Sequence, residues 1–117
     1  MRNLKIYHNP RCSKSRQTLQ IIRDHGIEPQ IVEYLKVRLE KVDLDRVFKL
    51  LGKRPKDFVR QSEADFKDNN ISALIENDTD LINAMIKFPK IIERPIVISE
   101  KKAVVGRPPE NVLKLIN

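Results

Sequence analysis

The sequence of 117 residues contains a single cysteine, no tryptophan and only three glycines. One cysteine excludes an intramolecular disulfide, and together with only two histidines it argues against a structural zinc site. Lone cysteines are typical of proteins in a reducing compartment. No apolar run approaches the roughly 20 residues of a membrane-spanning helix, and the first five residues lead into a strand pattern instead of a signal peptide. We therefore expect a cytoplasmic protein that does not enter a membrane.

The composition is that of one globular domain, with 40% apolar and 33% charged residues. The net charge of +7 is compatible with a nucleic acid, an acidic protein partner or a small anion as ligand. No run of Lys or Arg is longer than two residues, and only two Tyr and four Phe are present for base stacking. These features disfavour nucleic-acid binding.

The two ends of the chain carry the strand patterns. The predicted elements are a strand at Leu4–Tyr7, a helix from Ser13 to His25 closed by Gly26, a strand at Gln30–Leu35, a β-hairpin of Pro95–Ile98 and Ala103–Val105, and a last helix from Pro108-Pro109. A βαβ unit followed by a hairpin and a closing helix is the thioredoxin-like arrangement. The pattern therefore predicts an α/β, thioredoxin-like fold with a mixed four-stranded sheet.

Between these ends the pattern is helical. Asp43 is a candidate cap for a helix that ends at Gly52, and Thr79–Phe88 is a second firm helix stopped by Pro89. Shorter helical pieces are expected at Pro55–Val59, at Glu63–Lys67 and from about Ile71. We interpret residues 1–117 as a single domain with a helical insertion at about residues 40–90.

Cys12 is the candidate nucleophile, because it follows a strand and stands at the start of a helix. There the unpaired backbone N–H groups and the helix dipole favour a thiolate, and Arg11, Lys14 and Arg16 add positive charge. Ser15 occupies the place of a second cysteine, and Thr18 stands where a tyrosine-phosphatase loop needs arginine. A monothiol enzyme would need its second thiol from outside. The alternative is a buried, inert cysteine.

The segment Tyr7-His8-Asn9-Pro10-Arg11-Cys12-Ser13-Lys14-Ser15-Arg16-Gln17-Thr18-Leu19 resembles the opening motif, Asn-Pro-x-Cys-x-x-Ser-Arg, of the glutaredoxin-dependent arsenate reductases and their short paralogues. Ile92-Glu93-Arg94-Pro95-Ile96-Val97 and Gly106-Arg107-Pro108 resemble a second pair of motifs of that family. The resemblance extends from Leu4 to Ile116, with the motifs in the family's order.

The resemblance implies a set of functional residues. Cys12 would be the catalytic nucleophile, and His8 would help to keep its thiol ionised. Arg60, Arg94 and Arg107 would bind arsenate or a similar oxyanion, and Arg94-Pro95 would be a structural cis bond beside the cysteine. Glutathione would be the co-substrate and glutaredoxin the protein partner, with no bound cofactor and no metal.

The residues themselves leave other interpretations open. Guanidinium groups suit oxyanions, but an arginine among 23 basic residues can also be a solvated surface group. His8 can be a polar strand-end residue, and His25 a cation at a helix C-terminus. Arsenate reductases of the family usually continue past the last helix in a tail that the printed sequence does not have. A glutathione-dependent thiol reductase of another substrate therefore remains an alternative. A redox-related regulator that binds RNA polymerase is another, although such regulators commonly use a Cys-x-x-Cys switch that Ser15 removes here.

Overall fold

The computed structural model describes residues 3–116, which group into two compact units. The first, here called the sheet unit, combines residues 3–37 with residues 94–116. The second, the helical unit, consists of Arg38–Glu93. The helical segment thus interrupts the sheet unit in sequence, in the region where the pattern predicts an insertion.

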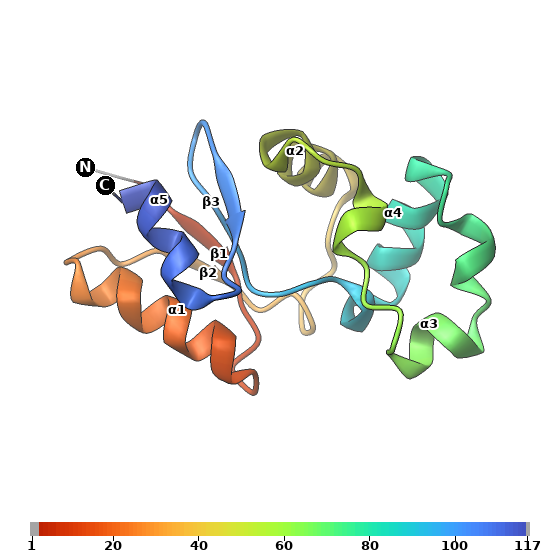
Figure 1. Cartoon of the computed structure of the whole chain (residues 1–117), viewed down its shortest axis with the longest axis horizontal. Helices are drawn as coiled ribbons and strands as arrows, with labels where there is room; N and C mark the ends of the chain where they lie inside the picture. Colours follow the sequence, from red (N-terminus) through yellow and green to blue (C-terminus); the bar gives the residue numbers. More distant parts are fainter. Residues whose placement is uncertain (1–2, 117) are drawn as a thin grey trace. The chain divides into compact units, whose positions relative to one another are not determined.

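The sheet unit is built on a four-stranded sheet (Figure 1). Its strands are β1 (Lys5–Tyr7), β2 (Gln30–Val32), β3 (Ile96–Ile98) and β4 (Ala103–Val105), in the order β2-β1-β3-β4. β1 and β2 are parallel and are joined through helix α1 (Ser13–Asp24), whereas β1 with β3 and β3 with β4 are antiparallel. This confirms the predicted thioredoxin-like fold with a mixed sheet.

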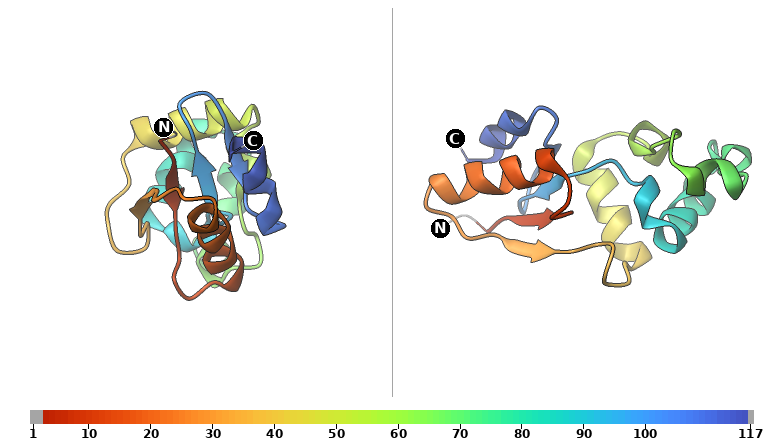
Figure 2. Two further views of the ribbon diagram at one scale, coloured as in Figure 1. Left: turned by 90° about the vertical axis from the view of Figure 1, so that its left-hand side faces the viewer. Right: turned by 90° about the horizontal axis from the view of Figure 1, so that it is seen from below.

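One face of this sheet carries the core of the unit. Because alternate strand residues face the same way, Leu4, Ile6 and Val97 share a face. They pack against Leu19 and Ile22 of α1, and against Val112 and Leu115 of the C-terminal helical elements η4 (Pro109–Val112) and α5 (Leu113–Ile116). Figure 2 shows α1 and α5 on the same side of the strands. This packing fixes the N-terminus of α1 relative to β1 and β3.

The helical unit has its own apolar interior. Its elements are α2 (Lys41–Leu51), η1 (Pro55–Phe58), α3 (Ala64–Asp68), η2 (Ile71–Leu74), α4 (Asp78–Lys87) and η3 (Pro89–Ile91). Val47 of α2 and Leu81 and Met85 of α4 are fully buried. The rings of Phe48 and Phe58 stack with centroids 5.7 Å apart, and such pairs contribute about 0.5–1.5 kcal/mol beyond area burial.

Several predicted boundaries were wrong in detail. Asp43 does not cap α2, because the helix begins at Lys41 after an extended Glu40, whose carbonyl accepts the Asp43 N–H. β2 ends at Val32 and not at Leu35, because a turn closed by the Lys36 N–H and the Glu33 carbonyl follows it. In both cases a local backbone hydrogen bond sets the boundary that periodicity leaves uncertain. The last helix begins where the pattern predicts, as a 3₁₀ turn at Pro109 with Pro108 as its N-cap.

Candidate active site

The Cys12 loop is shaped by its own backbone hydrogen bonds. Cys12 is the N-cap of the 12-residue helix α1, in an extended conformation (φ −93°, ψ 122°). Its N–H donates to the Asn9 carbonyl (3.0 Å), and its carbonyl accepts the Arg16 N–H (3.0 Å). The Asn9 side-chain oxygen also accepts the Arg11 N–H at 3.0 Å. The thiol is half-buried, which leaves it open to a reactant at the helix N-terminus.

The surroundings of Cys12 favour the thiolate. Burial alone raises the pKa of the Cys12 thiol, but hydrogen bonding by the backbone N–H groups of Ser15 and Lys14 lowers it, as do the charges of Arg94 and Arg107. The net effect places the pKa below its ordinary value. The predicted helix N-terminus and two of the predicted arginines therefore act on the sulfur, which becomes more nucleophilic at neutral pH.

His8 reaches α1 through Ser15. Both residues are buried, and the His8 Nδ1 and Ser15 Oγ atoms are 2.6 Å apart. The Asn9 N–H also donates to Ser15 Oγ, at 3.1 Å. Burial lowers the pKa of His8, and the charges of Arg23 and Arg16 add to this against an opposing effect of Glu33. The lowered pKa disfavours the positively charged ring of His8, and the contact with Ser15 connects His8 to the first turn of α1.

Arg107 links Cys12 to the segment before β3. Its Nη2 atom lies 3.8 Å from the Cys12 sulfur, and its Nε donates to the Arg94 carbonyl at 2.7 Å. Cys12 and Arg107 are 95 residues apart in sequence, and the antiparallel pairing of β3 with β4 brings the two arginine positions to the same end of the hairpin. The structure thus brings together Cys12, Arg94 and Arg107.

Arg94 has side-chain donors ready for a ligand. Within the described residues 3–116, its Nε and Nη1 atoms are buried and have no hydrogen-bond partner. Buried N–H donors without partners cost about 1–3 kcal/mol, more when charged, so an anion that accepts from them would be stabilised. The Arg94-Pro95 bond is cis, the geometry that the family resemblance implies, and Arg107-Pro108 is also cis.

Gly106 and Asn111, to which the sequence analysis assigns no role, hold this arrangement. A Cβ on Gly106 would come within 2.8 Å of Pro95 Cγ and closer still to the Thr18 hydroxyl. The Gly106 N–H donates to the Pro95 carbonyl at 2.9 Å. The Asn111 amide donates to the carbonyls of Val105 and Arg107, both at 3.1 Å. A lone glycine at the end of a strand was the available signal, since glycine there often marks a close approach.

Three basic residues lie close to Cys12 in the sequence. Arg11, Lys14 and Arg16 are exposed. The Arg16 guanidinium donates to the Pro10 carbonyl at 2.9 Å. It therefore supports the loop that carries Cys12.

Arg60 belongs to the helical unit. Its backbone follows a bridge between Val59 and Ile92, and its N–H donates to the Ile91 carbonyl at 2.6 Å. Its Nη1 atom donates to Glu63 Oε1 at 2.7 Å. The predicted role of Arg60 beside Cys12 stays a prediction.

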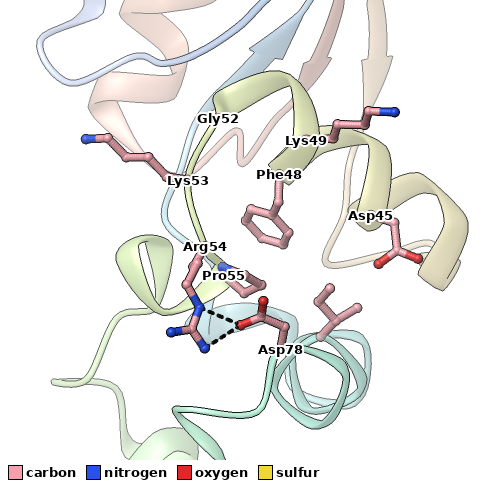
Figure 3. Close-up of a pocket in the computed structure, with 9 residues that line it drawn as sticks. Asp45, Phe48, Lys49, Gly52, Lys53, Arg54, Pro55 and Asp78 are labelled. Atoms are coloured by element: carbon pink, nitrogen blue, oxygen red, sulfur yellow. Dashed lines mark hydrogen bonds and ion pairs between the residues drawn. The ribbon is translucent and has the colours of Figure 1, made fainter.

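The helical unit also contains a pocket of about 380 Å³, without any predicted site residue (Figure 3). Its prominent cation, Arg54, donates through Nε and Nη2 to Asp78 Oδ1, at 3.0 Å each, and through Nη2 to the Glu76 carbonyl. That guanidinium ties η1 to the start of α4. Across residues 3–116, we find no group of three or more His, Cys, Asp or Glu side chains that could hold a metal ion. None of the helices in that range is long and apolar enough to cross a membrane.

Comparison with known proteins now decides the family. Residues 7–115 match the ArsC family. The chain belongs to the ArsC family. Over 116 residues it is 42% identical to the uncharacterized protein YfgD of Escherichia coli K12, covering 98% of each chain. Over 112 residues it is 39% identical to an arsenate reductase of Haemophilus influenzae, covering 95% of this chain and 97% of the relative.

The fold agrees with the same family. The solved arsenate reductase of Vibrio cholerae superimposes with a TM-score of 0.91 at 40% identity, covering 97% of this chain and 98% of that one. The arsenate reductases of Haemophilus influenzae and Vibrio cholerae are covered almost end to end. The ArsC family therefore includes proteins named arsenate reductase that align with this chain over nearly their whole length.

Proposed function

We propose that this ArsC protein reduces arsenate to arsenite, with Cys12 as its single nucleophile and with glutathione and glutaredoxin as external reductants. The observation that carries the proposal is the Cys12 sulfur at the N-terminus of α1, 3.8 Å from the Arg107 guanidinium and under the charge of Arg94. The similarity to arsenate reductases over nearly the whole chain supports arsenate as the substrate.

Binding follows from the charges around the sulfur. Arsenate is expected to carry about one to two negative charges, like a phosphate group, and would otherwise be repelled by a thiolate. The unpartnered Arg94 donors, the Arg107 fork and the N–H groups at the start of α1 offset this repulsion.

The chemistry then needs two external thiols. The Cys12 thiolate attacks As(V), an As–O bond breaks, and the oxygen leaves as water after it is protonated. Glutathione attacks the resulting thiol–arsenate adduct, and glutaredoxin resolves the mixed species. In the full cycle two thiols lose two electrons and become one disulfide, while arsenic gains those electrons and leaves as As(III) arsenite. Cys12 is regenerated, so one cysteine is sufficient.

A coupled assay, from which arsenate, glutathione or glutaredoxin is left out in turn, tests the proposal. Glutathione, glutaredoxin, glutathione reductase and NADPH are combined with the protein, and NADPH oxidation is followed with and without arsenate. The proposal expects turnover that requires arsenate, glutathione and glutaredoxin together. Turnover that is independent of arsenate would indicate a thiol reductase of another substrate. A reaction that proceeds without glutathione would contradict the assigned reductant.

A further inference from the structure

The Asn111 side chain spans the turn that carries Arg107. Its Nδ2 atom donates to the Val105 carbonyl and to the Arg107 carbonyl, both at 3.1 Å. A side-chain amide nitrogen has two N–H groups, so these two bonds use both of them. Because the two neighbouring atoms are carbonyl oxygens, which only accept, the amide nitrogen and not the amide oxygen must face them. The two bonds therefore hold the backbone on either side of Gly106.

The other end of this contact is fixed to the core of the sheet unit. Asn111 belongs to η4, and the next residue, Val112, is fully buried. Val112 lies in the same apolar cluster as Leu19 and Ile22 of α1, and α1 is the helix whose N-cap is Cys12. Asn111 thus joins the Arg107 turn to the core that also positions the cysteine.

The Arg107 guanidinium needs such support because Arg107 is exposed. Its Nη2 lies 3.8 Å from the Cys12 sulfur, while its Nε donates to the Arg94 carbonyl. Its N–H donates at 2.9 Å to the Val105 carbonyl, which also accepts from the Asn111 amide. An arginine side chain loses considerable rotamer freedom when it is ordered. A backbone held in one place limits the further freedom that must be lost to keep the guanidinium beside the sulfur.

We propose that Asn111 is a positioning residue, which holds the turn of residues 105–107 so that the Arg107 guanidinium stays beside the Cys12 sulfur. Asn111 acts on the thiol only through Arg107. Aspartate has the same shape but only accepts when ionised, and serine has a single O–H donor, so neither supplies the two donors that the turn uses. The consequence for oxyanion affinity rests on the proposed function, whereas the consequence for the thiol does not.

Several positive charges lie near the thiol, and the contribution of Arg107 is the one that should respond. The charges of Arg94 and Arg107 both lower the pKa of Cys12, as do the backbone N–H groups at the start of α1. Three further basic residues flank the cysteine in the sequence and are exposed: Arg11, Lys14 and Arg16. None of these other groups is mounted on the turn that the Asn111 amide holds.

The decisive variant is Asn111→Ala, in which the pH dependence of iodoacetamide alkylation reports on Cys12. We expect the alkylation midpoint to rise by part of the shift that Arg107→Ala produces. Asn111→Leu, which keeps the branched shape and removes both donors, should raise it in the same way. Sulfate binding, measured calorimetrically at constant ionic strength, should weaken by roughly threefold to tenfold in both variants. A wild-type alkylation midpoint in Asn111→Ala or in Asn111→Leu overturns the inference.

A double variant and a matched control separate positioning from general destabilisation. In the Arg107→Ala background, Asn111→Ala should cause no further shift of the alkylation midpoint, and a further shift of equal size would contradict an action through Arg107. Val112→Ala removes buried methyl groups from the same element, so it should lower the thermal stability and leave the midpoint unchanged. If Val112→Ala shifts the midpoint as Asn111→Ala does, the inference is wrong. Thermal melts check that each variant is folded at the assay temperature.

The two measurements distinguish this inference from the proposed function. If Arg107→Ala leaves the sulfate Kd unchanged while the midpoint rises in Asn111→Ala, the binding role of Arg107 in the proposed function fails and the positioning role of Asn111 stands. If Arg107→Ala weakens sulfate binding and raises the midpoint but Asn111→Ala does neither, only the present inference fails. It also fails if Arg107→Ala itself leaves the midpoint unchanged.

Discussion

The Arg107 guanidinium lies 3.8 Å from the Cys12 sulfur through Nη2, while its Nε is committed to the Arg94 carbonyl at 2.7 Å. One edge of the side chain is therefore fixed to the backbone, and another edge faces the nucleophile. Because the guanidinium is planar and rigid, fixing Nε also fixes the direction of the remaining donors. The contact with the Arg94 carbonyl therefore holds the positive charge of Arg107 close to the Cys12 thiol.

Removal of Arg107 should make the Cys12 thiol less acidic. The pKa of Cys12 is held below its ordinary value partly by the Arg107 charge, so iodoacetamide alkylation should show a midpoint below the free-thiol value of about 8.5. In Arg107→Ala the midpoint should move up towards that value. Arg46→Ala, which removes an exposed arginine of α2, is the control and should not shift it. A wild-type midpoint at or above about 8.5 would contradict the proposed thiolate.

Arg94 should determine oxyanion affinity through its shape as well as its charge. Charged hydrogen bonds contribute about 1.5–3 kcal/mol each, so Arg94→Ala should weaken sulfate binding by roughly tenfold or more. Arg94→Lys keeps the charge but loses the fork, and should remain impaired. Isothermal titration of both variants measures this. Wild-type affinity in Arg94→Lys would mean that Arg94 acts as a point charge, and wild-type affinity in Arg94→Ala would remove it from the site.

Gly106 should resist even the smallest substitution. In Gly106→Ala the new methyl group would press on Pro95 Cγ, at 2.8 Å, and on the Thr18 side chain. Overpacking of this kind typically costs about 1–3 kcal/mol, which urea denaturation can measure as a lower free energy of unfolding. Adding Thr18→Ala to Gly106→Ala relieves one of the two contacts and should recover part of the loss. Strictly additive losses in the double variant would show that the two residues do not press on each other.

His8 should titrate below its ordinary range. Burial lowers its pKa in the folded protein, so its NMR titration midpoint should lie below about 6.5. The unfolded chain then binds the proton more readily, and His8 reduces stability as pH falls from about 6.5 towards the folded pKa. His8→Gln should therefore lose stability less steeply than the wild type over that interval. An equally steep loss of stability in His8→Gln and in the wild type would contradict the assignment to His8.

Much of this site could be predicted from the sequence, because its residues lie close together in the chain or directly beside predicted strands. The helix predicted from Ser13 puts Cys12 at a helix N-terminus, and the predicted hairpin of Pro95–Ile98 and Ala103–Val105 lies between Arg94 and Arg107. Both expectations agree with the structure. The i,i+3 spacing of Arg60 and Glu63 was also present in the sequence, but nothing local distinguished it from an ordinary surface pair.

The supporting contacts could not be predicted in the same way. The hydrogen bond between His8 and Ser15 depends on how the end of β1 meets the first turn of α1. The contacts of Gly106 with Thr18 and Pro95 depend on packing between three separate segments. Such contacts join residues across the sheet unit, so they follow from the tertiary arrangement and not from periodicity or propensity.

The most direct test is the formation of arsenite by the wild type and by Cys12→Ser under identical conditions. Arsenate, glutathione and glutaredoxin are supplied in excess, and arsenite is separated from arsenate and quantified over time. The account predicts steady arsenite production by the wild type and only the protein-free background rate with Cys12→Ser. Arsenite production at the wild-type rate by Cys12→Ser, or none above background by the folded wild type, would contradict it.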